Sequence, residues 1–290
     1  MSRLRRGLVG LVVITRPGNV LLTAVSVAVG GVCAEARWGS PLVLACLSAA
    51  LIAAGGYVVN DLFDLEVDRI NRPGRPLPRG DLSLRQAGVW AITLLGAGPL
   101  LAWTLGRATG LTATGVAVGL VLYAAYLKRT AFVGHVLVAV MSGTAFAYGG
   151  MVGPRTDTSL VPAILAGAFH LGREMFKAAA DWLGDRRGGL RTMAVRWGVK
   201  KTCRLAIVPL AVVVVLSPLP TVWGWFGSFY LITVTVGVDT VLLYAMYRAW
   251  QSPDMKTAQR LADLLKWDMV AGLVAVGGDR WLNWLPLIGR

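Results

Sequence analysis

The sequence of 290 residues has few charged residues, few cysteines and only two histidines. Charged residues make up 15% of the chain, against about 25% in an ordinary soluble domain, which argues against a soluble globular protein. The three cysteines, Cys33, Cys46 and Cys203, lie in or beside apolar segments without metal-site spacing, so we expect small buried residues there. Neither a P-loop nor a GxSxG motif is present, which removes two common signatures of nucleotide binding and ester hydrolysis.

Apolar sequence is what the chain has in abundance. Hydrophobic residues make up 56% of it, and its mean hydropathy is +0.62. Runs close to the roughly 20 residues that a bilayer requires predict an all-α integral membrane protein with one domain over residues 1–290. We expect nine spans, at 17–36, 41–60, 84–105, 108–127, 132–152, 158–180, 202–219, 227–249 and 268–287. Between the last two, residues 254–266 are expected to form a short amphipathic helix on the membrane surface.

Basic residues gather in alternate loops. They are concentrated in the N-terminal arm and in the loops at 61–83, 128–131, 181–201 and 250–267. The other loops carry only Arg37, Arg107 and Arg155, apart from Arg280 and Arg290 at the C-terminal end. This positive-inside pattern predicts a multi-pass protein of the cell membrane with a cytoplasmic N-terminus. The net charge of +14 is therefore expected to meet membrane lipids and phosphorylated substrates, with no nucleic acid as partner.

The most polar stretch, NDLFDLEVDRINRPGRPLPRG, covers residues 60–80 and follows directly on an apolar run. If the helix continues, Asp61, Asp64 and Asp68 share one face, with Asn60 just before them. Stacked carboxylates are tolerated where they bind a cation, and oxygen ligands favour a hard ion such as Mg²⁺. The alternative is a solvated acidic helix end, but nearby arginines, including Arg69 and Arg72, suit a metal-chelated polyanion.

A second charged cluster closes the sixth expected span. Arg173, Lys177, Asp181 and Asp185 recur every four residues, which predicts a single stripe along a helix. Ionisable residues within a span normally line a cavity. Both acidic groups follow even-numbered spans, so we expect them on the cytoplasmic side, facing each other around a pair of Mg²⁺ ions and a diphosphate. Arg173 and Lys177 would reach the same phosphates from deeper in the span.

Three further polar residues are candidates for substrate binding. Lys128 and Arg129 end the fourth expected span at the same side, where ordinary membrane anchoring is the alternative explanation. Asn19 is polar within the first span and is expected to line the cavity. His135, among apolar neighbours in the fifth span, is expected to be a hydrogen-bonded structural residue.

These motifs resemble the UbiA superfamily of intramembrane prenyltransferases. Residues 60–68 resemble its NDxxDxxxD motif, DWLGD at 181–185 resembles its second, DxxxD motif, and YAAYLKR at 123–129 is similar to its YxxxLKR stretch. The resemblance implies nine helices around a central cavity, with polar loops capping the cytoplasmic side. It implies a phosphate contact for Lys128, and it assigns metal and diphosphate binding to Asn60, Asp61, Asp64, Asp68, Asp181 and Asp185.

The activity implied by this resemblance is Mg²⁺-dependent transfer of a prenyl group from its diphosphate to an acceptor in the membrane. The wording INRPxRPxPxG and GDxxGGLRT looks most like the archaeal ether-lipid branch, which joins a geranylgeranyl group from geranylgeranyl diphosphate to geranylgeranylglyceryl phosphate. One departure is that Ala178, Ala179 and Ala180, and also Leu183, occupy positions where an acidic residue is expected. Two alternatives remain open: an aromatic acceptor such as 4-hydroxybenzoate in quinone biosynthesis, and a transporter of a phosphorylated lipid.

Overall fold

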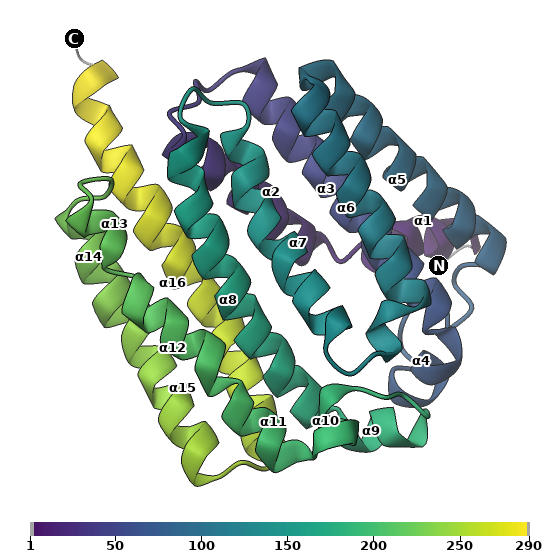
Figure 1. The fold of residues 1–290 in the computed structure, drawn as a ribbon. Helices are drawn as coiled ribbons and strands as arrows, with labels where there is room; N and C mark the ends of the chain where they lie inside the picture. The colour runs from purple at the N-terminus through teal and green to yellow at the C-terminus, as the bar shows by residue number, and fades with distance from the viewer. Residues whose placement is uncertain (1–2, 289–290) are drawn as a thin grey trace. The chain divides into compact units, whose positions relative to one another are not determined.

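The computed structural model describes residues 3–288, without the side chains of residues 3, 4, 70, 71 and 283–288. Arg290, which we counted among the basic residues of the far side, lies outside this range. All regular structure within the described range is helical, as the sequence predicts (Figure 1). The chain forms two compact units, one of residues up to Ala28 with Trp38–Leu127, the other of Val29–Arg37 with the chain from Lys128 onward.

The first unit is built around a helical hairpin. Its core is α3 against α5, where the Ser48 hydroxyl donates to the Gly98 carbonyl at 2.8 Å. A Cβ atom added to Gly98 would lie 2.5 Å from Ile52, so only glycine permits this close approach. The N-terminus of α5 is capped by Ser83 and Gln86, whose side chains each bond to the other's backbone N–H. Its helices are α1 (Arg3–Ile14), the start of α2 (Pro17–Cys33), α3 (Ser40–Phe63), α4 (Leu65–Asn71), α5 (Leu84–Leu105) and α6 (Arg107–Ala125).

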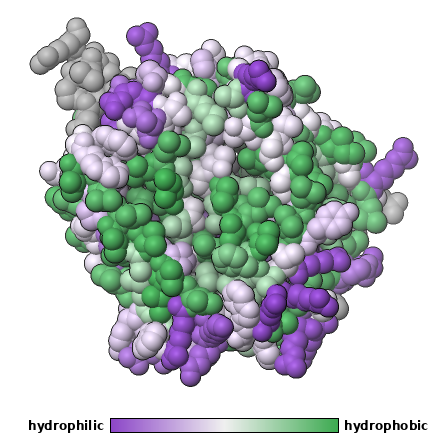
Figure 2. Space-filling model, viewed as in Figure 1, coloured by the Kyte–Doolittle hydropathy of each residue, from purple (hydrophilic) through white to green (hydrophobic). Residues whose placement is uncertain are grey.

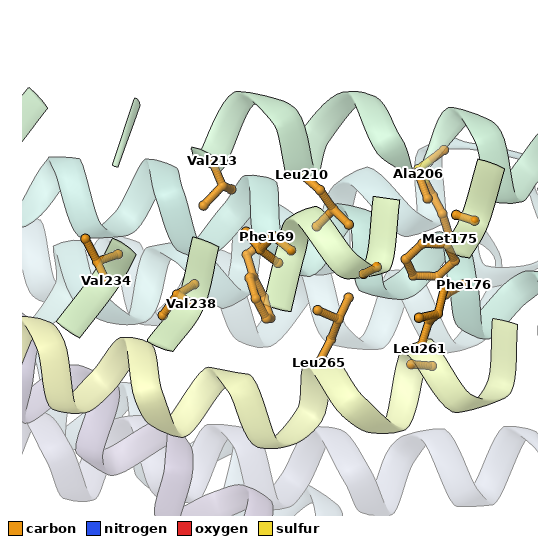
Figure 3. Close-up of a cluster of buried hydrophobic side chains, with 14 of the residues drawn as sticks. Phe169, Met175, Phe176, Ala206, Leu210, Val213, Val234, Val238, Leu261 and Leu265 are labelled. Atoms are coloured by element: carbon orange, nitrogen blue, oxygen red, sulfur yellow. The ribbon is translucent and has the colours of Figure 1, made fainter. Parts of the chain in front are cut away.

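The second unit is built on the hairpin of α7 and α8. A Cβ atom added to Gly143 of α7 would lie 2.4 Å from the Ala163 carbonyl of α8, so these helices also touch through glycine. Figure 3 shows the apolar cluster around α8, in which Phe176, Leu210 and Leu265 are fully buried. Its elements are η1 (Leu127–Arg129, at the boundary), α7 (Val133–Gly150), α8 (Thr156–Ala180), α9 (Trp182–Arg187), α10 (Met193–Trp197), α11 (Val199–Leu205), α12 (Ile207–Leu216), α13 (Leu219–Val222), α14 (Ser228–Thr233), the π-helix η2 (Val234–Asp239), α15 (Thr240–Gln251) and α16 (Met255–Ile288).

The expected count of nine membrane spans is not confirmed. Six helical segments of the described chain are long and apolar enough to cross a bilayer, and the bent pair α1–α2 makes a seventh if it counts as one span. The other two expected spans fall in α8 and α16, which are long helices that carry several charged residues. Many large apolar side chains are exposed, and Figure 2 shows them over much of the face in view, as a multi-pass membrane protein requires.

The expected surface segment at 254–266 and the last expected span are one helix. The 34 residues of α16 run without interruption from Met255 to Ile288. Treating them as two segments was wrong because it rested on the change from amphipathic to apolar sequence, whereas residues 255–285 contain no proline to stop a helix. Asp254 caps its start by accepting the backbone N–H of Thr257 at 2.8 Å.

Candidate active site

The first aspartate segment continues as helix beyond α3, as the spacing predicts, with one break. α3 ends at Phe63 and α4 begins at Leu65, while Asp64 between them adopts φ −94° and ψ 2°. The backbone hydrogen bonds carry on across this joint, because the Asp64 N–H reaches the Asn60 carbonyl and the Asp68 N–H reaches the Asp64 carbonyl. The bridge region that Asp64 occupies is sparsely populated and recurs at active sites.

Two of these aspartates are buried and held by arginines. Asp61 and Asp68 are 3% and 5% exposed. The Arg75 guanidinium bridges them, donating to Asp61 Oδ1 at 3.1 Å and also to Asp68 Oδ2. Arg16 donates to the same Asp61 oxygen. Buried carboxylates are stable only when such partners offset their desolvation, so this corner of the first unit is a site of concentrated, balanced charge.

Arg16 reaches Asp61 from the bend between α1 and α2. Its φ of 55° lies in the left-handed region, which is unfavourable for a residue with a side chain. Its guanidinium also lies 4.9 Å from the centre of the Tyr57 ring, on the helix that carries Asp61. Arg16 was not among the candidates from the sequence, and the structure places it beside Asp61.

The remaining residues of this segment are divided between the site and the surface. Asn60 donates through Nδ2 to Asp64 Oδ2 at 2.8 Å, which orients both side chains. Arg72 lines a pocket of about 390 Å³ together with Arg16, Asp61 and Arg75. Arg69 lies apart from the buried aspartates, since it pairs with the exposed Glu66 at 2.7 Å.

The donor set of this segment suits a hard cation in its chemistry, although its geometry is not yet that of a metal site. Among the described residues, no three acidic, histidine or cysteine side chains are grouped closely enough to hold a metal ion. Asn60, Asp61, Asp64 and Asp68 nevertheless offer only oxygen ligands, as Mg²⁺ prefers. The positive charge that Asp61 and Asp68 require is supplied by Arg16 and Arg75. A cation bound there would therefore compete with guanidinium groups.

The second aspartate segment has the same construction as the first. α8 ends at Ala180 and α9 begins at Trp182, and Asp181 between them adopts φ −83° and ψ 2°. Asp181 is exposed, while Asp185 accepts a hydrogen bond from the Thr192 hydroxyl at 3.0 Å. Each motif thus ends a long helix with an aspartate joint and a single short helix. This likeness in backbone supports treating the two segments as counterparts.

The basic residues of α8 make contacts that the stripe alone did not predict. Lys177 donates to Glu174 at 2.7 Å, and Arg173 lies 3.8 Å from the same carboxylate. Glu174 is buried. Arg173 also donates through Nε to the Ala262 carbonyl of α16 at 3.1 Å. Lys177, whose side chain is 43% exposed, is the more accessible of the two cations.

The other candidates have varied surroundings. Lys128 is partly buried and Arg129 is exposed, both in the short helix η1. Asn19 is partly buried in the first turn of α2. The expectation of a hydrogen-bonded His135 is wrong, because both of its ring nitrogens are buried without a partner among the described residues.

Two residues near the predicted site were missed as binding candidates: Arg16 and Glu174. Arg75 was among the arginines expected beside the aspartates, but no specific contact was assigned to it. Glu174 had a usable signal, since it stands three positions before Lys177, a spacing at which helical side chains meet. Arg16 and Asp61 are 45 positions apart, and no local pattern relates them.

Comparison with known proteins decides the family. Residues 22–270 match the UbiA prenyltransferase family, across both units of the chain. The chain belongs to this family. A digeranylgeranylglyceryl phosphate synthase of Methanopyrus kandleri is 36% identical over 262 residues, which cover 90% of this chain and 96% of that protein.

Two solved structures share the UbiA fold. One, from work on digeranylgeranylglyceryl phosphate synthase in membranes, has a TM-score of 0.81 at 28% identity and covers 97% of this chain and 99% of its own. The other is a UbiA homologue from Archaeoglobus fulgidus bound to DMAPP and Mg²⁺, with a TM-score of 0.66 at 18% identity. It covers 91% of this chain and 97% of its own, and at that identity the likeness concerns the fold.

Proposed function

We propose that this UbiA family member transfers a geranylgeranyl group from geranylgeranyl diphosphate to the free hydroxyl of geranylgeranylglyceryl phosphate within the membrane. The reaction would form an ether bond of a membrane lipid and would depend on Mg²⁺. The relative from Methanopyrus kandleri carries the name of this activity and aligns over 90% of the chain. The Archaeoglobus fulgidus homologue contains both a prenyl diphosphate and Mg²⁺. The whole of 1–290 would act as one prenyltransferase domain, with its N-terminus and aspartate segments on the cytoplasmic side.

The observation that carries this proposal is the pair of buried carboxylates, Asp61 and Asp68, at the end of a membrane helix. Burying these two carboxylates is unfavourable because it removes them from water. The guanidinium groups of Arg16 and Arg75 offset this cost, so the buried carboxylates require positive charge beside them. Bound Mg²⁺ would supply such charge and would stabilise the departing diphosphate. In the first unit Asn60, Asp61, Asp64 and Asp68 would hold Mg²⁺, and in the second unit Asp181 and Asp185 would do so.

The arginines and lysines would then act on the phosphates. Arg75 and Arg16, once they exchange their carboxylate partners for phosphate oxygens, would grip the diphosphate as charge-assisted donors. Arg72 lines the same pocket and would assist them. In the second unit, Lys128 and Lys177 would bind phosphate. The apolar helices would exclude water, which would otherwise capture the cation that forms at the allylic carbon.

The second aspartate segment departs from the ether-lipid pattern, since Ala178–Ala180 and Leu183 make it less acidic than expected. The alternative acceptor to be tested is therefore an aromatic one, such as 4-hydroxybenzoate. A transporter of phosphorylated lipids has no comparable observation in its favour.

Aspartate variants test the proposed site. Transfer from labelled geranylgeranyl diphosphate should fall at least about a hundredfold in Asp61→Asn and in Asp181→Asn, because a lost metal ligand weakens both metal binding and leaving-group stabilisation. Asp157→Asn is the matched control, since Asp157 is exposed at the start of α8 and pairs only loosely with Arg155 at 3.6 Å. Rates equal to wild type in both site variants would remove these residues from the reaction.

A further inference from the structure

A basic pocket lies on the second unit, outside both aspartate segments. It has a volume of about 480 Å³ and sits at the turn from α10 into α11. Its walls include Trp197, Val199, Lys200, Lys201 and Arg204, with no acidic residue among them. Three positive charges around one small hollow suit an anion.

Arg204, in one wall of the pocket, is held by a contact with an aromatic ring. The Arg204 guanidinium lies 4.7 Å from the centre of the Trp250 ring, and its Nε is buried without a hydrogen-bond partner among the described residues. Because Arg204 also lines the pocket, its positive charge is available to an anion there. On the other wall, the Lys201 ammonium lies 5.8 Å from the centre of the Trp197 ring. Both tryptophans are exposed, as is usual at the boundary between lipid and water.

An apolar track leads away from this pocket along α12. Val208, Val212 and Val215 follow Arg204 at four, eight and eleven positions, which places them on the same side of the helical segment. All three are exposed. Figure 1 shows α15 running beside α12, and its Leu243 and Tyr247, also exposed, lie about two turns and one turn before Trp250, respectively. A hydrocarbon chain that starts at Arg204 would therefore meet exposed apolar side chains of α12 and α15.

We propose that this pocket binds the phosphate headgroup of an anionic membrane phospholipid, with an acyl chain lying along α12 and α15. A lipid suits the site better than a soluble phosphate because the charged hollow opens onto an apolar track and is bordered by interfacial tryptophans. The loops of this side are the basic ones, which anionic lipids attract. The site is separate from the transfer reaction, and it stands whether or not the proposed activity is correct.

The test measures lipid binding to the purified full chain in detergent by native mass spectrometry. The probes are phosphatidylglycerol, diacylglycerol with the same acyl chains, and glycerol phosphate without chains. The double variant Lys200→Gln/Lys201→Gln should weaken phosphatidylglycerol binding about tenfold or more, since each basic residue near the membrane surface contributes roughly a fivefold gain in affinity. Both lysines are exposed, so the variant should fold, and an unchanged melting temperature checks this.

The matched control is Lys256→Gln/Arg260→Gln, which removes the same charge from exposed positions of α16 on the same expected side of the membrane. The control should change phosphatidylglycerol binding less than twofold. If both double variants bound phosphatidylglycerol equally weakly, the loss of affinity would follow from net charge alone, which would overturn the proposal. If diacylglycerol bound as tightly as phosphatidylglycerol, the pocket would not recognise a phosphate headgroup. If glycerol phosphate bound as tightly as phosphatidylglycerol, the acyl chains would contribute nothing and the ligand would not be a lipid. Either result would overturn the proposal.

Discussion

Replacing Arg75 with glutamine removes the one side chain that bridges both buried aspartates of the first unit. Glutamine keeps the polarity and much of the length of arginine but none of its charge. In the variant, Asp61 retains Arg16, while Asp68 loses the arginine that holds it. The variant therefore tests how much the stability of the fold depends on positive charge beside these aspartates.

The size of the effect follows from burial. The side chains of Asp61 and Asp68 are 4% and 8% exposed, and that of Arg75 is 18% exposed. Breaking a fully buried ion pair costs about 3–5 kcal/mol. Because Arg75 is partly solvated and Asp61 keeps a second cation, we expect a loss of about 2–3 kcal/mol in the free energy of unfolding.

The assay is thermal unfolding in detergent, with and without Mg²⁺. Arg75→Gln should lower the melting temperature by about 5 °C or more, and Mg²⁺ should restore more stability to the variant than to the wild type, because the ion replaces the missing charge. Arg69→Gln is the control, since its exposed pair with Glu66 is worth less than about 1 kcal/mol. Equal melting temperatures for the two variants, or a variant indifferent to Mg²⁺, would refute the reasoning.

Two further predictions concern packing and capping. Gly98→Ala should destabilise the first unit by about 1–3 kcal/mol, because the new Cβ would lie 2.5 Å from Ile52. Gly96→Ala, with nothing within 4 Å, should cause no loss of stability in the same denaturation assay, since alanine is more favourable than glycine in a helix interior. Asp254→Ala should cost about 1 kcal/mol through loss of the α16 cap. Since the Thr257 N–H lowers the pKa of the Asp254 carboxyl below its ordinary value, the cap contributes fully above about pH 4 and is lost as the pH falls further. Melting curves against pH should therefore converge for wild type and Asp254→Ala in acid, and a constant difference would contradict the role of the charge.

The sequence was a good guide where chemistry depends on local spacing. Asp61, Asp64 and Asp68 are placed by the helical period, and so are Asp181 and Asp185, because each motif prolongs a long apolar helix by a few residues. The apolar runs likewise predicted an all-helical membrane protein. The breaks at Asp64 and Asp181 were not predicted, since nothing in the residue pattern distinguishes a single bridge-region residue from a continuous helix.

Other features depend on contacts between distant residues. Arg16 meets Asp61 only because the chain bends between α1 and α2, with Arg16 itself in a left-handed conformation that no periodicity indicates. The expected division between residues 254–266 and 268–287 was wrong for a related reason, since both segments lie in α16. A change of hydropathy along the chain indicates a change of surroundings and does not by itself end a helix. The count of nine spans is not confirmed at α8 and α16, since both of these long helices carry charged residues among the apolar ones.

The central claim is transfer of a geranylgeranyl group to a phosphorylated glycerol lipid, and one competition assay tests it most directly. Purified protein in detergent receives labelled geranylgeranyl diphosphate and Mg²⁺, with geranylgeranylglyceryl phosphate and 4-hydroxybenzoate offered side by side. We predict label in the product of the glycerol lipid alone, and none when the divalent ion is chelated. Label in prenylated 4-hydroxybenzoate instead, or transfer that proceeds unchanged after chelation, would contradict the account.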